Sequence, residues 1–221
     1  MEIALYIIEI IGTIAFAVIG VMIAIDKGFD IFGIAVLGVT TALGGGLIRD
    51  LIIGRIPPNM FIHPSYLLVS LITCAVVFLW IWWRKEIYLH RRQVIENVFN
   101  ILDAVGLAVF AVIGVMSAWH RGFDNGFLCV FVGLCTACGG GIVRDVIAND
   151  VPMIFHSHVY AIAAIIGSLI CYLMVHYHIH EYIAISVGGA AVFLFASLPS
   201  NINGICRLFV LKNKNFIKRA T

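Results

Sequence analysis

Long apolar segments, separated by short polar breaks, run through almost the whole chain. Most of these segments have about 20 residues, which lets an α-helix cross a hydrocarbon layer of about 30 Å. Breaks that contain charged residues or proline divide the chain into seven expected helices, near residues 3–25, 31–53, 65–83, 98–119, 126–148, 159–177 and 182–199. We therefore expect an all-α membrane protein with seven transmembrane helices.

The composition agrees with a membrane protein. Of the 221 residues, 62% are hydrophobic and 12% are charged, and the mean hydropathy is +1.06. Soluble domains have roughly 25% charged residues. A cleavable signal peptide does not explain apolar segments that recur along the chain. The net charge is only +2, and the basic residues lie beside apolar segments as topology signals, so we expect no nucleic-acid partner.

The basic residues are distributed unequally over the two membrane faces. Leaving aside Arg49 and Arg144, which lie inside expected helices, two Lys and Arg residues fall on the face where the chain begins and ten on the other. Basic segments stay in the cytoplasm, so we predict an external N-terminus and a cytoplasmic C-terminus. Near the basic loop the third helix ends with three interfacial tryptophans, Trp80, Trp82 and Trp83.

The two halves of the chain repeat each other. The segment Phe16–Met22 recurs unchanged at Phe110–Met116, at an offset of 94 residues. The offset then becomes 95, and Gly-Gly-Gly-x-x-Arg-Asp occurs at 44–50 and 139–145, with Pro57 aligned to Pro152. Each copy has three crossings, an odd number, so the second copy must enter from the opposite face. We predict an inverted repeat of three plus three helices, with a seventh helix outside it.

This repeat divides one membrane domain into three parts. Residues 1–97 hold the first three-helix repeat and a basic cytoplasmic loop, and residues 98–180 hold the inverted second repeat. Residues 181–221 hold the seventh helix and a basic cytoplasmic tail. The helices at 31–53 and 126–148 are each expected to begin after an aspartate N-cap, Asp30 and Asp124.

Cysteine and histidine do not predict a metal centre or a disulfide framework. The six cysteines lie almost entirely in apolar segments, where small residues pack between helices. We interpret the pair Cys135 and Cys138 as packing residues. His176, His178 and His180 alternate in a loop, but alternate side chains on a helix diverge, so we interpret this stretch as an ordinary interfacial loop. We expect no metal, no cofactor and no enzymatic activity.

Two runs of three glycines lie inside apolar helices, although each glycine costs about 1 kcal/mol relative to alanine. Close helix packing would explain one such run. Two runs at equivalent depth favour helix breaks that expose carbonyl groups to a cation path near the midplane. We expect kinks at both runs, Gly44, Gly45 and Gly46 in the first copy and Gly139, Gly140 and Gly141 in the second.

Each glycine run is followed by an arginine and an aspartate within the expected span: Arg49 and Asp50, then Arg144 and Asp145. Ionisable groups at this depth need a partner or water, unless a long side chain reaches the interface. Consecutive residues point about 100° apart on a helix, so we expect each arginine to find its partner elsewhere in the chain.

The repeat indicates these partners, because Glu9 and Asp103 match at the offset of 94. Each lies a short way into its helix, from the face that the arginine of the same copy approaches. We hypothesise ion pairs between Glu9 and Arg49 and between Asp103 and Arg144. The aspartate after each arginine would then remain available to water or ions.

Together these motifs resemble the trimeric intracellular cation channel family, in its bacterial and archaeal branch, which is also named for a glycine-transporter domain. The resemblance covers essentially the whole chain. It implies a homotrimer in a bacterial or archaeal plasma membrane, with one pore for monovalent cations such as K⁺ in each subunit. The glycine runs would be the kinks that constrict this pore, and the path would be lined or gated by Arg49, Asp50, Arg144 and Asp145.

Two functional classes remain open from the residues. The first is a channel whose partners are monovalent cations and membrane lipids. The second is an alternating-access transporter for glycine or a similar small zwitterion, because a half-helix N-terminus beside Arg49 could hold a substrate carboxylate.

Overall fold

The computed structural model describes residues 2–84, 92–156 and 158–197. All seven expected segments are helical there, and two short helices, α3 and α8, were not predicted. The helices are α1 (Glu2–Asp26), α2 (Ile31–Ile52), α3 (Asn59–Ile62), α4 (Ser65–Trp83), α6 (Arg92–His120), α7 (Gly126–Ile147), α8 (Met153–His156), α9 (His158–His176) and α10 (Glu181–Ser197). Residues 85–91 of the predicted basic loop and the whole basic tail lie outside the described residues.

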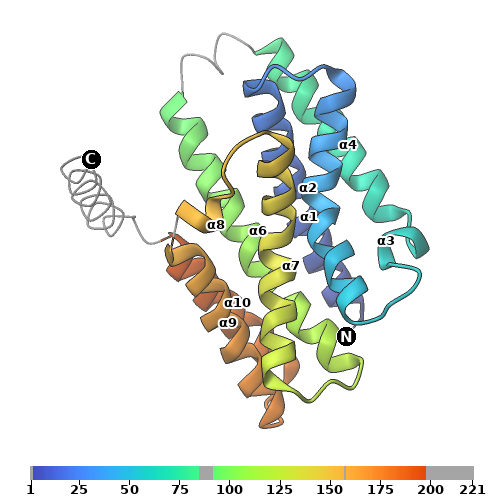
Figure 1. The fold of residues 1–221 in the computed structure, drawn as a ribbon, viewed down its shortest axis with the longest axis vertical. Coiled ribbons are helices and arrows are strands. Elements are labelled where there is room, and N and C mark those ends of the chain that lie inside the picture. The colour runs from blue at the N-terminus through green and yellow to red at the C-terminus, as the bar shows by residue number, and fades with distance from the viewer. Residues whose placement is uncertain (1, 85–91, 157, 198–221) are drawn as a thin grey trace, which may run out of the picture.

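The fold is that of an all-helical membrane protein. Among the described residues, α1, α2, α4, α6 and α7 are long and apolar enough to cross a membrane, and α9 and α10 are shorter apolar helices. The helices α1, α2, α6 and α7 form the centre, with α4 on one flank and the paired α9 and α10 on the other (Figure 1). Below, the face at which α1 begins is called the N-terminal face.

The inverted repeat is visible in the backbone, because α1 to α4 match α6 to α9. Two residues after the ends of both α2 and α7 lies a residue with positive φ, Gly54 at 69° and Asn149 at 57°. The next N–H groups, of Arg55 and Asp150, donate to the carbonyl five residues earlier at 2.7 and 2.8 Å. These matching ends make Arg55 and Asp150 structural equivalents at the offset of 95.

The predicted alignment of Pro57 with Pro152 is wrong by one residue. Pro58 directly precedes α3 as Pro152 directly precedes α8, and the two short helices match at the offset of 94. The connection in the first repeat therefore contains one extra residue.

Only one of the two predicted N-caps is correct. The Asp30 side chain accepts a hydrogen bond from the N–H of Gly33 at 2.7 Å. In the second repeat Asn125 caps α7 instead. Asp124, one residue too early for this role, lies 3.0 Å from Nδ1 of His176 through its Oδ1.

The glycine runs do not interrupt their helices, since 31–52 and 126–147 are α-helical throughout. The predicted breaks with released carbonyls are therefore wrong. The glycines instead bring the backbones of α2 and α7 together. A methyl group on Gly45 would collide with the carbonyl of Thr136, and one on Gly140 with the carbonyl of Thr41. Small residues are the usual means of such close packing between membrane helices.

Candidate functional site

Arg49 lies at the centre of a buried polar cluster in the first repeat. Its Nη1 is 2.7 Å from Oε1 of Glu9, and its Nε is 2.9 Å from Oδ1 of Asp50. The Arg49 side chain is only 2% exposed. The structure thus brings Glu9 and Arg49 together as hypothesised, although α1 and α2 contribute them from opposite ends of their helices.

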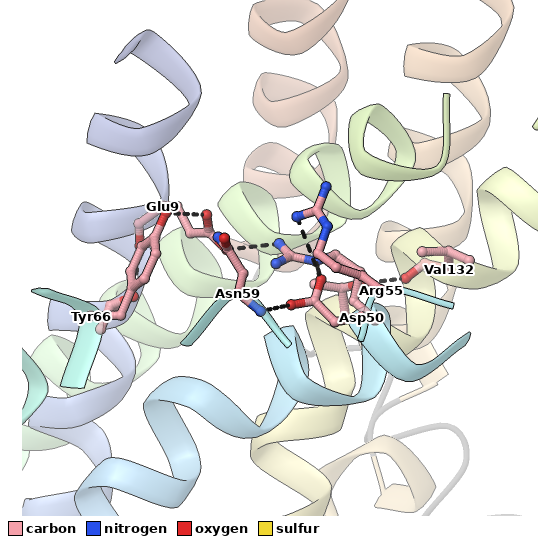
Figure 2. A network of polar contacts seen from close by, with 9 residues as sticks. Glu9, Asp50, Arg55, Asn59, Tyr66 and Val132 are labelled. Atoms are coloured by element: carbon pink, nitrogen blue, oxygen red, sulfur yellow. Dashed lines mark hydrogen bonds and ion pairs between the residues drawn. The ribbon is translucent and has the colours of Figure 1, made fainter. Parts of the chain in front are cut away.

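Two further groups complete this cluster. The Tyr66 hydroxyl of α4 donates to Oε2 of Glu9 at 2.8 Å, and the first N–H of α3, at Asn59, donates to Oδ2 of Asp50 at 2.6 Å. Figure 2 shows the carboxylates of Glu9 and Asp50 meeting these groups, with Arg55 above Asp50. Arg55 Nη1 is 3.8 Å from Asp50 Oδ1. We call this set the first-repeat cluster: Glu9, Arg49, Asp50, Arg55, Asn59 and Tyr66.

The second repeat builds an equivalent cluster around Arg144. Its Nη1 lies 3.2 Å from Oδ1 of Asp103, and its Nε lies 2.7 Å from Oδ1 of Asp145. The N–H of Met153, which begins α8, donates to Oδ2 of Asp145 at 2.9 Å. Tyr160, the counterpart of Tyr66, is buried and interacts with the Asp103 side chain. We call this set the second-repeat cluster: Asp103, Arg144, Asp145, Met153 and Tyr160.

Two expectations about these charges are wrong. Each arginine does contact the aspartate that follows it, because the long side chain folds back and presents its Nε to the neighbouring carboxylate. Asp50 and Asp145 are also not available to water, being 1% and 6% exposed with both oxygens hydrogen-bonded. The arginines are buried as well, and their side chains are paired inside the protein.

Sequence reasoning missed the two tyrosines. Tyr66 and Tyr160 match at the offset of 94, the same signal that identified Glu9 and Asp103. It also missed the hydrogen-bond donors from α3 and α8. These are the backbone N–H groups of Asn59 and Met153, and the residue type at these positions does not indicate them.

Cavities lie at both ends of the central helices. A cavity of 570 Å³ at the N-terminal face is bordered by Glu9, Arg49, Arg55 and Tyr66, among others. A pocket of 20 Å³ adjoins it, shares Glu9 and Arg49, and extends to Gly46 and Phe110. At the opposite face a separate cavity of 310 Å³ lies between the end of α1 and the start of α6.

Phe16 and Phe110 stack in the core between the two repeats, with ring centroids 5.2 Å apart. Phe110 borders the 20 Å³ pocket. The aromatic pair therefore lies at the inner end of the 570 Å³ cavity and its adjoining pocket. Fixed charges next to a narrow, poorly hydrated space act strongly on an ion, because little water screens them.

Bacterial membrane proteins are similar in sequence over most of the chain. A UPF0126 membrane protein of Vibrio cholerae is 40% identical over 172 residues, which cover 75% of this chain and 66% of the relative. The UPF0126 inner membrane protein YadS of Escherichia coli is 39% identical over 165 residues, covering 75% of this chain and 76% of the relative.

Solved structures share the fold. A prokaryotic TRIC channel crystallised in 0.5 M KCl has a TM-score of 0.80 and 34% identity, covering 89% of this chain and 95% of that chain. The TRIC trimeric intracellular cation channel orthologue from Rhodobacter sphaeroides has a TM-score of 0.79 and 31% identity, over 88% and 95% of the two chains.

The family model described as "Glycine transporter" matches residues 6–82 and again 100–176. These two matches coincide with the two structural repeats, each carrying one charged cluster. The chain therefore belongs to the Glycine transporter family.

Proposed function

We propose that the protein is a channel for K⁺ and other monovalent cations, with an ion path inside each subunit. The fold supports this function, since TRIC cation channels of 31% and 34% identity superpose over most of the chain. The observation that carries the proposal is the 570 Å³ cavity, which reaches the ion pair of Glu9 and Arg49 inside a membrane-spanning helix bundle.

The path would run from this cavity through the 20 Å³ pocket to the stacked pair of Phe16 and Phe110. Beyond the pair it would pass the second-repeat cluster and reach the 310 Å³ cavity. The close contact of α2 and α7 at the glycine runs would hold the narrow part of the path at a constant width.

Cation preference follows from the side chains along this route. Glu9 borders the 570 Å³ cavity and Asp50 borders the 20 Å³ pocket, and their buried counterparts in the second repeat are Asp103 and Asp145. Each arginine already binds two of them, so its positive charge is neutralised locally. An entering cation would meet the Glu9 carboxylate at the cavity, where the Arg49 guanidinium is already paired with Glu9 and Asp50 and the Arg55 guanidinium lies beside Asp50.

Recordings from purified protein in planar bilayers test this proposal. We expect unitary currents that reverse near the K⁺ equilibrium potential in a KCl gradient. Glu9→Gln should lower cation conductance, because the amide removes a charge at the end of the cavity. Asp30→Asn is the matched control, since it makes the same change on an exposed N-cap that asparagine also serves. Equal currents from Glu9→Gln and wild type would contradict the proposed path.

A transporter for a small zwitterion is the second candidate. Glu9 and Arg49 stand side by side at the cavity, where a carboxylate could hold a substrate ammonium and a guanidinium could hold a substrate carboxylate. Saturable uptake of labelled glycine into vesicles, without unitary currents, would favour this function over the channel.

We further propose that the protein is a homotrimer in the bacterial inner membrane. Its relatives include an inner membrane protein and a trimeric channel orthologue. Native mass spectrometry of the protein in detergent should give three times the subunit mass of 24.3 kDa. A monomeric mass under mild conditions would contradict the trimer.

A further inference from the structure

The helix α10, which lies outside the inverted repeat, reaches the N-terminal cavity through its first residue. Glu181 begins α10, and His120 is the last residue of α6. Oε2 of Glu181 lies 3.0 Å from Nε2 of His120. His120 borders the 570 Å³ cavity. The pair therefore places a carboxylate of α10 within one hydrogen-bond length of the cavity wall.

This pair is accessible to protons from the solution at the N-terminal face. The His120 side chain is 37% exposed and the Glu181 side chain 25%. Histidine is the side chain whose charge ordinarily changes between pH 5 and 8. With a neutral imidazole the pair carries the negative charge of Glu181, and with an imidazolium the two charges cancel.

The first-repeat cluster gives the same cavity no net charge of its own. Glu9 and Arg49 pair at 2.7 Å in the wall of the cavity. Arg55, also in the wall, lies 3.8 Å from Asp50. These two positive and two negative charges sum to zero, so they do not fix the sign of the charge at the cavity mouth.

Further titratable groups surround His120 at this face. Arg121, its neighbour in sequence, donates to the Gly54 carbonyl at 3.2 Å and keeps its positive charge at physiological pH. The others are Tyr6, His63 and Tyr66 at the cavity border, and the pair of His176 with Asp124. Among the described residues at that border, His63 and His120 are the histidines, so their charges ordinarily change between pH 5 and 8.

The inverted repeat shows which residue type His120 replaces. Its counterpart at the offset of 94 is Asp26, the last residue of α1, which borders the 310 Å³ cavity at the opposite face. Both cavities thus have a carboxylate near the mouth. At the opposite face α1 carries it, whereas at the N-terminal face α10 supplies it and an imidazole contacts it.

We propose that Glu181 attracts cations to the N-terminal cavity and that His120 cancels this attraction in acid. A neutral imidazole leaves the Glu181 charge to raise the local cation concentration, and an imidazolium neutralises it. Acid at the N-terminal face should therefore lower the cation current. This role rests on the proposed channel function.

The size of the effect follows from electrostatics in salt solution. One elementary charge acting through water over about 8 Å changes the local cation concentration roughly 1.5-fold at 0.1 M salt. At 1 M salt the Debye length falls to about 3 Å, so the effect should disappear. A movement of helices driven by the same proton would survive high salt.

Recordings of single channels in planar bilayers test this role, with all variants made in a His63→Gln background. We expect each channel to respond to acid from one side alone, with roughly 1.5-fold lower conductance at pH 5 than at pH 8 in 0.1 M KCl. His120→Gln should abolish this response. His176→Gln is the matched control, because it removes an imidazole that also lies 3.0 Å from a carboxylate but is not among the described residues at the cavity border.

Glu181 itself should show a graded effect at pH 8. Glu181→Gln should lower the conductance, and Glu181→Lys should lower it further, because the charge changes by one unit in each step. Unchanged conductance in both variants overturns the proposal. A response to acid that persists in His120→Gln or in 1 M KCl also overturns it, since another group or a helix movement would then be responsible.

The same recordings separate this role from the channel itself. Unitary currents that ignore acid would overturn the role of His120 and leave the channel standing. The absence of unitary currents at every pH would overturn the channel and, with it, the role of Glu181.

Discussion

Phe16 and Phe110 occupy the same position in the two repeats and stack on each other, with an angle of 30° between their rings. Each ring also covers a glycine of the other repeat, Phe16 over Gly106 and Phe110 over Gly12. A residue that meets its own counterpart must lie next to the pseudo-two-fold axis. The aromatic pair therefore marks the centre of the subunit, midway between the two charged clusters.

Phe16→Ala should widen the proposed ion path at the centre of the subunit. Phe16 is 1% exposed, and loss of a buried phenylalanine side chain costs about 3–5 kcal/mol in soluble proteins. We expect a lower unfolding temperature together with a larger unitary conductance. Phe32→Ala, which removes a ring that is 76% exposed, should change neither. A destabilised variant with wild-type conductance would show that ions do not pass the aromatic pair.

Two neighbouring glycines of the first run, Gly45 and Gly46, allow the contact between α2 and α7 to be tested with a matched control. Gly45→Ala places a methyl group against the Thr136 carbonyl, which cannot rotate away, whereas the nearest atoms to a methyl group on Gly46 are at 3.8 and 4.0 Å. We expect Gly45→Ala to lower the unfolding temperature strongly and Gly46→Ala to leave it nearly unchanged. Equal effects of the two substitutions would contradict the observed approach of α2 and α7.

Tyr66→Phe removes the hydrogen bond to Glu9 and keeps the ring. Hydrogen bonds to charged groups contribute about 1.5–3 kcal/mol, so the unfolding temperature should fall. Glu9 should also become free to move toward the cavity and change the cation conductance. Tyr6→Phe is the control, because no hydrogen bond of its hydroxyl occurs among the described contacts. A Tyr66→Phe protein with wild-type stability would contradict the Glu9 contact.

Lys27 and Asp150 connect the two repeats at the face opposite the N-terminal face. Their side chains are 36% and 50% exposed, so water screens the pair and its contribution should be about 0.2–1 kcal/mol. Lys27→Asp should lower stability at low salt, because two acids then face each other. Adding Asp150→Lys should restore it. A double variant no more stable than Lys27→Asp would contradict a direct pairing.

The excess of Lys and Arg residues on the face opposite the N-terminal face predicts a cytoplasmic C-terminus. A fluorescent protein fused after Thr221 should mature in living cells, and alkaline phosphatase fused there should be inactive. The reverse result would contradict the predicted orientation.

The inverted repeat made much of this fold predictable from sequence. The apolar segments predicted the helices, and the common offset of Glu9 and Asp103 predicted which acid meets which arginine. The offset works because equivalent residues occupy equivalent depths, even when the sequences between them differ.

Other features could not be read from residue types. A glycine run is compatible with both a helix break and a backbone contact, and only the position of the facing carbonyl of Thr136 distinguishes them. The pairing of Arg49 with Asp50 depends on how a flexible side chain folds, which helical spacing does not specify. The hydrogen-bond donors from α3 and α8 are main-chain N–H groups, so no residue type indicates them.

The meeting of α2 and α7 at Gly45 and Gly140 has a mechanical consequence. A carbonyl group seated against each glycine fixes how far apart the two helix backbones lie at this depth. One polar link lies on either side of it, Lys27 with Asp150 at one face and Arg121 with the Gly54 carbonyl at the other. The two repeats are therefore joined at three depths, by a backbone contact in the middle and by one polar link toward each face.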